Sequence, residues 1–347
     1  MKKIMENYQA GVNLGGWISQ YRKLDHEHFR TFIVEDDIRQ IASWGMDHVR
    51  LPFDYPVLED DERPFEYKED GFAYLDNCIE WCKKYGLNVI LDLHRAPGYF
   101  FGTLQSNTLF EDKTMEDRFL NLWRTIAKRY ANEGDNIMFE LLNEMVEPTS
   151  DRWNKLAHKA IKAIHEIDSD RYIVYGGNHY NSINELKNID LVKDSDRIIY
   201  TFHFYHPFLF THQRAGWNQF TREYNAVIEY PGMCPNLKEF LEANPQYYEW
   251  NKFFIDHEMN KDLMIQDMQP AVDFMESTGE TVYCGEYGVI MIAPLQSRIN
   301  WHRDFIDITK ELKIGRACWN YKVLDFGLVD HNSKVISEEL VKVVSAK

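Results

Sequence analysis

Eight short apolar runs, separated by longer amphipathic stretches, are the feature that most limits how this 347-residue chain can fold. The runs are rich in Val, Ile, Tyr and Phe, and most lack the apolar–polar alternation of a sheet with one solvated face. They occupy residues 9–16, 48–53, 88–94, 137–144, 171–178, 198–205, 281–288 and 316–322. Strands that are buried on both faces have this composition, so the pattern predicts a parallel sheet covered by helices.

The stretches between the runs predict helices. Residues 72–86 place apolar side chains at intervals of three and four, with lysines near the end. Residues 114–134 are expected to begin with Thr114 as the N-cap and to have Gly134 after their end. The same pattern recurs at 151–168 and 297–315.

Eight consecutive strand–helix units predict an α/β fold, the (β/α)8 TIM barrel, as a single domain over residues 1–347. A doubly wound open sheet is the structural alternative. That fold usually has fewer strands and often a glycine-rich phosphate turn after the first one. Gly11, Gly15 and Gly16 do not form that motif, which favours the barrel.

The gap between the sixth and seventh runs is unusually long, since their starts are 281 − 198 = 83 residues apart. A barrel needs roughly 250 residues, so this chain has roughly 100 to spare. Much of the surplus lies in residues 206–260, which contain 12 aromatic residues. We expect an inserted subdomain or lid after strand six, with most of its rings in a small core and one to three facing a ligand.

Charge and cysteine usage exclude several classes of protein. The 39 Lys and Arg against 55 Asp and Glu give a net charge of −16, which disfavours nucleic acid as a partner. The five cysteines are scattered and have no zinc-ribbon spacing. The sequence also has no calcium, nucleotide or flavin motif, so no metal or other cofactor is expected. In the absence of a heptad pattern, a monomer is the expected oligomeric state.

The chain has no apolar run of the roughly 18 residues that a membrane span requires. Its first residues include two lysines but no apolar segment behind them, so no signal peptide is visible. We therefore expect a cytoplasmic protein as encoded, with no membrane partner. Extracellular action stays open if a signal was removed.

Polar side chains gather at the ends of the predicted strands. Active sites of such barrels lie at the C-terminal ends of the strands, and a polar group is costly in a strand buried on both faces. Seven of the eight runs nevertheless carry a polar side chain at their C-terminal end. These candidate site residues are Arg50, His94, Asn143, Glu144, Asn178, His203, Tyr205, Glu286 and Trp319.

Glu144 and Glu286 form the central pair, on the fourth and seventh strands. Two carboxyl groups that face each other across a cleft can split a glycosidic bond, one as a proton donor and the other as an ionised nucleophile. The neighbouring candidates fit this chemistry. Arg50 and Tyr205 can donate to the nucleophile, and Asn143 can bind a sugar hydroxyl. His94 and His203 can bind hydroxyls or tune the acid, and Trp319 offers a ring to a sugar face.

Several segments of the chain carry a family resemblance: FELLNE at 139–144, YCGEYG around Glu286, GVNLGGW at 11–17, HVRLPF, LDLHRAPG, HFYHPF and WNYK. In these segments the chain resembles glycoside hydrolase family 5, of clan A. The opening GGWISQ, the SNTLFED segment at 106–112 and the long insertion are similar to the cellulase C type of endoglucanase. The resemblance implies a retaining enzyme with Glu144 as acid/base and Glu286 as nucleophile. It also implies that the subsite around the cleaved bond is formed by Arg50, His94, Asn143, His203, Tyr205 and Trp319.

The resulting hypothesis is a retaining endo-β-1,4-glucanase that acts on cellulose-like or mixed-linkage β-1,3-1,4-glucan polysaccharides or oligosaccharides. Its two carboxyl groups should lie about 5–5.5 Å apart. Within the family, a β-mannanase or glucomannanase and an exo-β-1,3-glucanase are the alternatives. From other classes, a metal-dependent barrel hydrolase that uses the histidines and a non-catalytic sugar-binding protein stay open.

Overall fold

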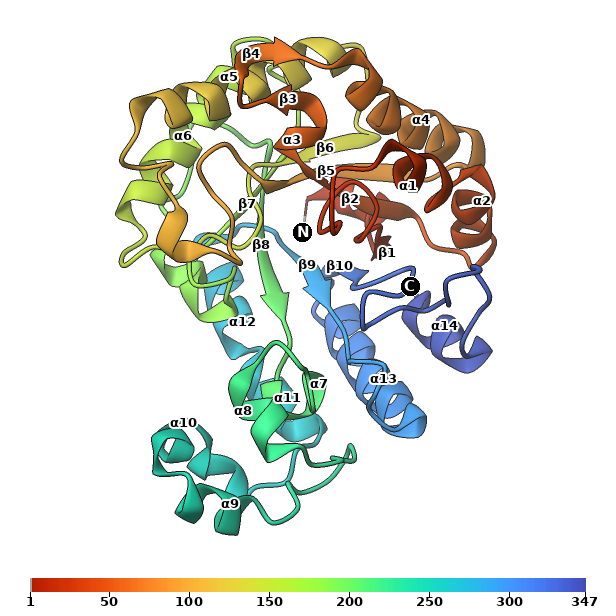
Figure 1. Ribbon diagram of the computed structural model, residues 1–347, viewed down its shortest axis with the longest axis vertical. Helices are drawn as coiled ribbons and strands as arrows, with labels where there is room; N and C mark the ends of the chain where they lie inside the picture. Colours follow the sequence, from red (N-terminus) through yellow and green to blue (C-terminus); the bar gives the residue numbers. More distant parts are fainter. Residues whose placement is uncertain (1) are drawn as a thin grey trace.

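The computed structural model, which describes residues 2–347, is a closed barrel of eight parallel strands in the order β1-β10-β9-β8-β7-β6-β5-β2 (Figure 1). The barrel strands are β1 (Ala10–Asn13), β2 (His48–Asp54), β5 (Asn88–Arg95), β6 (Ile137–Glu140), β7 (Ile173–Gly176), β8 (Ile198–Phe204), β9 (Val282–Tyr287) and β10 (Gly315–Cys318). Each of the eight apolar runs supplies one of them. The prediction of a (β/α)8 barrel is therefore confirmed.

Helices surround the barrel and cover the outer face of its strands (Figure 1). The long ones are α2 (Glu35–Ser43), α4 (Glu69–Tyr85), α5 (Lys113–Tyr130), α6 (Asp151–His165), α12 (Gln269–Thr278) and α13 (Leu295–Glu311). Shorter elements are η1 (Lys3–Asn7), α1 (His26–Thr31), α3 (Tyr55–Leu58), η2 (Leu104–Ser106), η3 (Ile183–Asn188), α14 (Glu338–Val344) and the hairpin of β3 (Glu59–Asp60) and β4 (Arg63–Tyr67). Within residues 2–347, no helix combines the length and the apolar character needed to cross a membrane.

The ends of two predicted helices test the capping rules. Gly86 ends α4 in the left-handed conformation, with φ +73°, as a C-terminal glycine should. The expectation of Thr114 as the N-cap of α5 is wrong, because Asp112 caps the helix and accepts a 2.8 Å hydrogen bond from the Thr114 N–H. A carboxylate is favoured at this position, since it both accepts that bond and opposes the positive end of the helix dipole.

The barrel interior changes character along the strands. At the N-terminal ends, inward side chains form an apolar plug with residues of η1 and the segment that follows it. Members of this plug are Met5, Tyr8, Ile90, Met138, Val174, Ile199, Tyr283 and Ala317. Because successive side chains alternate between the faces of a strand, the next inward positions are two residues further on. On β5 and β6 these are Asp92 and Glu140, both buried, so the interior becomes polar toward the C-terminal ends.

The long connection between β8 and β9 contains a group of short helices, most of which stand out from the barrel at the bottom of Figure 1. They are α7 (Phe208–Thr211), α8 (Gln219–Tyr224), α9 (Leu237–Ala243), η4 (Pro245–Tyr247), α10 (Tyr248–Asn251), η5 (Lys252–Ile255) and α11 (Lys261–Asp267). The rings of Phe220, Tyr224, Phe240 and Tyr247 pack together with centroids 5.1–6.2 Å apart. We propose that residues 206–260 form an inserted subdomain with these rings as its local core.

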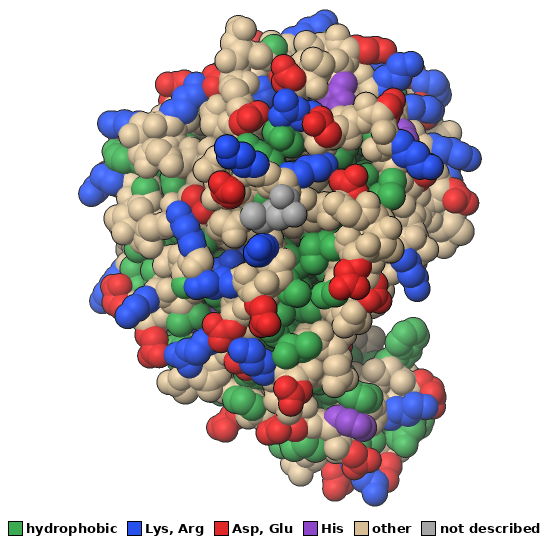
Figure 2. Space-filling view, turned by 180° about the vertical axis from the view of Figure 1, so that it is seen from behind, with side chains coloured by type: hydrophobic (Ala, Val, Ile, Leu, Met, Phe, Trp, Pro, Cys, Tyr) green, Lys and Arg blue, Asp and Glu red, His purple; other side chains and the backbone are tan. Residues whose placement is uncertain are grey.

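Hydrophobic side chains also reach the surface of this projecting lobe, beside charged ones (Figure 2). Trp217 and Trp250 are 58% and 86% exposed, while most other aromatic residues of the insertion are buried or half-buried. The aromatic residues of the insertion are therefore of two kinds. Most are packed within it, and a few are exposed and available for other contacts.

Candidate active site

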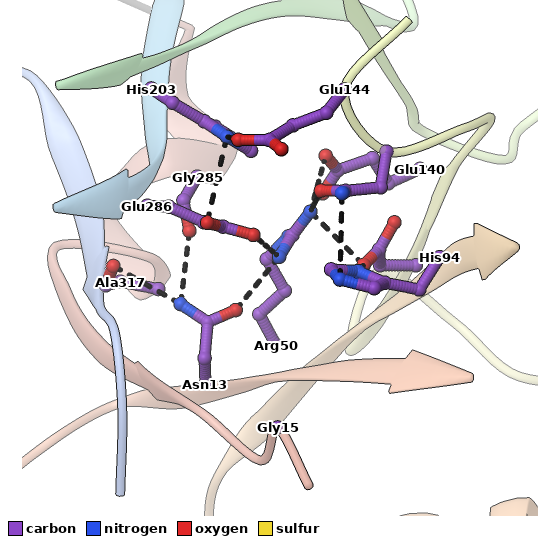
Figure 3. A network of polar contacts seen from close by, with 12 residues as sticks. Asn13, Gly15, Arg50, His94, Glu140, Glu144, His203, Gly285, Glu286 and Ala317 are labelled. Atoms are coloured by element: carbon purple, nitrogen blue, oxygen red, sulfur yellow. Dashed lines mark hydrogen bonds and ion pairs between the residues drawn. The ribbon is translucent and has the colours of Figure 1, made fainter. Parts of the chain in front are cut away.

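Arg50 on β2 is the centre of a polar network at the C-terminal ends of the strands (Figure 3). Its side chain is fully buried and meets three carboxylates. Glu140 accepts two of its hydrogen bonds, from Nε at 2.7 Å and from Nη2 at 2.9 Å. Asp92 Oδ2 lies 3.0 Å from Nη2, and Glu286 Oε1 lies 2.8 Å from Nη1. One buried cation therefore compensates the charge of three buried carboxylates. Charges removed from water require such pairing.

Two asparagines complete the coordination of this guanidinium. Asn13 at the end of β1 accepts from Nη1 of Arg50, and Asn143 accepts from Nη2, both at 2.9 Å. The amide nitrogen of Asn13 donates to the carbonyl oxygens of Gly285 and Ala317, at 3.0 and 3.2 Å. Arg50 is thus held by acceptor oxygens from opposite sides of the barrel, which fix the position of its charge.

Glu286 on β9 has donors on both carboxylate oxygens. Arg50 binds Oε1, and the hydroxyl of Tyr205 donates a 2.9 Å hydrogen bond to Oε2. The pairing of β8 with β9 shifts register after Phe202, and this shift sets His203 opposite Glu286. Burial raises the pKa of Glu286, while the charge of Arg50 and the hydrogen bond from Tyr205 act in the opposite direction and favour the carboxylate.

Glu144 lies four residues beyond the end of β6, and its side chain is 15% exposed. Its Oε1 is 3.0 Å from Nδ1 of His203. Burial, and next the negative charge of Glu286, raise the pKa of Glu144 well above its usual range. Arg50 bonds directly to Glu286 and not to Glu144, so the proton that the pair shares belongs on Glu144.

The two carboxyl groups are close together. One oxygen of Glu144, one of Glu286 and a ring nitrogen of His203 all lie within 4.8 Å of one another. Among residues 2–347, this is the one set of His, Cys, Asp and Glu side chains arranged closely enough to hold a metal ion. The Arg50 guanidinium, 2.8 Å from Glu286, repels a cation at this place. The arrangement therefore fits a proton-donating acid beside an ionised nucleophile better than a metal centre.

The backbone around Glu144 is held from both sides. Glu144 itself has φ +43°, a left-handed conformation that costs free energy in a residue with a side chain. The hydroxyl of Tyr99 donates to the Glu144 carbonyl at 2.8 Å and accepts from the Val146 N–H at 2.7 Å. The N–H of Tyr180 donates to the carbonyl of Met145 at 3.1 Å. These bonds hold Glu144 in its unusual conformation.

Asn178, predicted to bind substrate, has another role in the structure. Its amide oxygen accepts from the N–H of Glu147, and its amide nitrogen donates to the Glu147 carbonyl, both at 2.8 Å. The side chain is fully buried. With both ends of its amide occupied, Asn178 positions the loop that carries Glu144 and is not brought to the carboxyl pair, so we correct our expectation for this residue.

His94 is a neutral imidazole, because burial lowers its pKa to about 3. Its Nδ1 lies 2.7 Å from Asp92 Oδ2, and its Nε2 lies 3.4 Å from the amide nitrogen of Asn143. Since the Asn143 oxygen already accepts from Arg50, the amide nitrogen donates to Nε2, and Nδ1–H donates to Asp92. The ring of Trp319 stacks on His94 with centroids 5.6 Å apart and planes within 8°. Trp319 and Asn143 are thereby fixed beside the carboxyl pair.

His203 is also neutral, because burial lowers its pKa well below the usual value. Its Nδ1 faces both carboxyl groups, 3.0 Å from Glu144 and 3.6 Å from Glu286. A neutral ring adds no positive charge beside Glu144. The structure thus places eight of the nine predicted site residues at or beside one network.

Sequence reasoning missed Asn13, Asp92 and Glu140, which are part of this network. A usable clue was present, since Asp92 and Glu140 are acids inside strands predicted to be buried on both faces. Buried acids require a cation to compensate their charge. Arg50 is the cation predicted on a neighbouring strand, so its pairing with these acids could be predicted.

The comparisons with known proteins agree with this geometry. The family model described as cellulase (glycosyl hydrolase family 5) matches residues 7–324. The chain is 51% identical to Endoglucanase C of Acetivibrio thermocellus over 346 residues, which is 99% of each protein. It is 34% identical to Cellodextrinase A of Ruminococcus flavefaciens over 314 residues, covering 89% of this chain and 84% of that one.

Solved structures support the fold alone. The endoglucanase Cel5A from the hyperthermophilic Thermotoga maritima superposes with a TM-score of 0.80 at 23% identity. The match covers 99% of this chain and 98% of that structure.

Proposed function

The chain belongs to glycosyl hydrolase family 5, and from this premise and the site geometry we propose that it is a retaining endo-β-1,4-glucanase acting on cellulose-like or mixed-linkage β-1,3-1,4-glucans. One observation carries the proposal. Two glutamates have oxygens within 4.8 Å of each other, and only one of the two is bonded to Arg50 and Tyr205. A short separation of this kind is typical of retaining enzymes, whereas inverting enzymes need about 6.5–9.5 Å to admit a water molecule.

In the first step, an oxygen of the Glu286 carboxylate attacks the anomeric carbon while the bond from that carbon to the leaving oxygen breaks. Glu144 delivers its proton to the leaving oxygen. The raised pKa of Glu144 favours its protonated form, and the donors on Glu286 favour the ionised form of the nucleophile. The product is a glycosyl ester of Glu286, together with a shortened glucan chain that departs.

In the second step, Glu144 is ionised and takes a proton from a water molecule, which attacks the same carbon. The ester bond to Glu286 breaks and the carboxylate is restored. Because Glu286 becomes neutral in the ester, Glu144 loses its negative neighbour and its pKa falls between the two steps. The two attacks from opposite sides give net retention at the anomeric carbon.

The remaining residues bind the sugar at the cleaved bond. We assign Asn143 to a hydroxyl next to the anomeric carbon, since its amide lies between Arg50 and His94. The ring of Trp319, only 6% exposed, is assigned to stacking under that sugar. His94 and His203 add neutral polar groups around it.

The test is reducing-sugar release from carboxymethylcellulose, barley β-glucan, laminarin and glucomannan. Wild type is compared with Glu144→Gln, Glu286→Gln and the control Glu276→Gln, which alters an exposed residue of α12. We expect cleavage of the β-1,4-containing glucans, loss of nearly all activity in both site variants, and full activity in the control. Activity on none of the polymers, or activity that survives in Glu286→Gln, contradicts the proposal.

Azide separates the roles of the two glutamates. With a nitrophenyl cellobioside, Glu144→Ala should still form the glycosyl-enzyme, and azide should release it as the β-glycosyl azide. In Glu286→Ala, azide should replace the nucleophile itself and give the α-glycosyl azide. Exchange of these two products between the variants refutes our assignment of acid/base and nucleophile.

A further inference from the structure

Four polar side-chain atoms inside the barrel have no hydrogen-bond partner among residues 2–347. They are Oγ1 of Thr201, Nε2 of His203 and both amide atoms of Asn181. All three residues are buried, with at most 5% of their surface exposed. Because an unpaired buried polar group costs free energy, native proteins satisfy most such groups with protein atoms or with bound water. Several of them in one place therefore point to a ligand that they share.

Two inward-facing glycines leave room beside these atoms. On β7, β8 and β9, the residues two positions beyond the apolar plug are Gly176, Thr201 and Gly285, so their side-chain positions also face the barrel interior. At the corresponding positions of β5 and β6 stand Asp92 and Glu140. The interior is therefore filled by long side chains on one side and is open on the other.

The unpaired atoms face this open side. A Cβ at Gly285 would lie 3.2 Å from Nε2 of His203 and 3.2 Å from Oγ1 of Thr201, so both atoms border the room that this glycine leaves (Figure 3). A Cβ at Gly176 would collide with the amide of Asn181. Since Gly176 pairs with Thr201 across β7 and β8, the amide lies on the same side of the interior as the hydroxyl.

A strained loop brings Asn181 into the barrel. His179, Tyr180 and Asn181 follow one another with φ of +48°, +60° and +55°, a left-handed conformation that costs free energy in residues with side chains. The carbonyl of Asn181 accepts a 2.8 Å hydrogen bond from the N–H of His203, which ties the loop to β8. The result of this strain is a buried amide next to the strand that carries His203.

The surroundings of His203 determine which ring nitrogen carries the hydrogen. Nδ1 is 3.0 Å from Oε1 of Glu144 and 3.6 Å from Oε2 of Glu286, and these two carboxyl groups share a negative charge in the proposed mechanism. The hydrogen of the neutral ring therefore belongs on Nδ1, where it can be donated. Nε2 is then an acceptor and requires a donor from the side of Thr201 and Asn181.

We propose that a buried water molecule, bound by Thr201 and Asn181, donates a hydrogen bond to Nε2 of His203 and thereby fixes the tautomer of the ring. The water donates its second hydrogen to the amide oxygen of Asn181 and accepts from the hydroxyl of Thr201. About three hydrogen bonds are usual for a buried water. The inference rests on the proposed function and makes Thr201 and Asn181 positioning residues for its acid.

The tautomer matters because it decides where the acid holds its proton. With hydrogen on Nδ1, His203 donates to Oε1 of Glu144, and the proton for the leaving oxygen stays on Oε2. With hydrogen on Nε2, the ring accepts the Glu144 hydroxyl, which turns the proton away from the substrate and stabilises the protonated acid. Loss of the water should therefore slow the departure of poor leaving groups and raise the pKa of Glu144.

The titratable and charged groups around the His203 ring are Glu144 and Glu286 at Nδ1, and Arg50 and His94 at longer range. The substitutions below change none of them. A shift in the pH profile therefore reports the hydrogen bonds of the ring and not a change in local charge.

Two substitutions each remove one polar group, and a third is the matched control. Thr201→Val replaces the hydroxyl by a methyl group of the same shape. Asn181→Gly removes the amide, and glycine adopts a φ of +55° without strain. Thr309→Val is the control, because Thr309 on α13 is equally buried but its hydroxyl donates to the Phe305 carbonyl of its own helix at 3.0 Å.

The kinetic experiment measures kcat/KM against pH for dinitrophenyl and phenyl cellobiosides. Dinitrophenolate departs without a proton, whereas phenol needs one from the acid. In both site variants, activity on the phenyl substrate should fall about tenfold, and activity on the dinitrophenyl substrate should change by less than about twofold. The basic limb for the phenyl substrate should move to higher pH by about one unit, because the acid stays protonated longer. An equal loss on both substrates, a basic limb that stays in place, or the same changes in Thr309→Val overturns the proposal.

Two direct observations keep this inference separate from the proposed reaction. A crystal structure of the wild type should show a water within hydrogen-bond distance of Thr201 Oγ1, the Asn181 amide and His203 Nε2, and Thr201→Val should lack it. Nitrogen NMR of histidine-labelled protein should place the hydrogen of this ring on Nδ1, with its signals identified by their loss in His203→Asn. Neither observation requires turnover, so both decide the inference even if Glu286→Gln still cleaves glucans and the proposed mechanism fails. A wild type without this water, or with the hydrogen on Nε2, overturns the inference.

Discussion

Replacing Tyr205 by phenylalanine removes the hydroxyl that donates a 2.9 Å hydrogen bond to Glu286 and retains the ring. The ring contacts with His212 and Phe326, at 5.0 and 5.9 Å, should survive because the two side chains have the same shape. The substitution therefore alters the environment of the carboxylate with little change in packing.

The size of the effect follows from the bond that is lost. A hydrogen bond to a charged group contributes about 1.5–3 kcal/mol, and about 1.36 kcal/mol corresponds to one pKa unit. The bond from Tyr205 lowers the pKa of Glu286, so its removal should raise that pKa by about one to two units. Glu286 attacks only when ionised, and kcat/KM falls as the pH drops through its pKa. The acid limb of the profile should consequently move to higher pH by the same one to two units.

The assay is the pH dependence of kcat/KM for a nitrophenyl cellobioside, which reports the pKa values of the free enzyme. Tyr130→Phe is the matched control, because Tyr130 also donates a 2.9 Å hydrogen bond to a carboxylate, that of Asp76, between α5 and α4. This control should lower the stability and leave the acid limb unchanged. An acid limb that stays in place in Tyr205→Phe, or that moves equally in the control, would show that Tyr205 does not set the ionisation of Glu286.

Two further substitutions test the positioning of the site. Asn178→Ala leaves both backbone groups of Glu147 without their partner, so urea titration should show a loss of about 1–3 kcal/mol, and kcat should fall more for a poor leaving group than for nitrophenol. An equal fall for both leaving groups would mean that the loop does not position the acid. Gly15→Ala places a Cβ 2.6 Å from Cη2 of Trp319 and should lower kcat/KM about tenfold or more by displacing the indole. Gly134→Ala, whose Cβ would approach only a side-chain oxygen at 3.7 Å, is the control, and similar activities of the two variants would contradict a role for the ring position.

The chain itself determined the architecture and the location of the chemistry. Hydrophobic periodicity is a local property, so eight doubly buried runs could be counted and their order read without any coordinates. Polar residues at the ends of those runs were recognisable for the same reason, because each one is costly in its own strand. Glu144 and Glu286 are predicted in this way, and the family resemblance implies their roles.

Only the tertiary structure decided which side chains act together. Arg50 bonds to Glu140, 90 positions away, and to Glu286, 236 positions away, and no spacing along the chain encodes those contacts. Asn178 has the residue type and the strand-end position expected of a substrate-binding group. Its amide nevertheless bonds to the backbone of Glu147 in a neighbouring loop. Trp217 and Trp250 are both exposed tryptophans of the same insertion, yet Trp217 lines a cavity of about 970 Å³ and Trp250 does not. Burial and periodicity act within a segment, whereas the partner of a polar group depends on distances across the barrel, which exist only after the strands have closed.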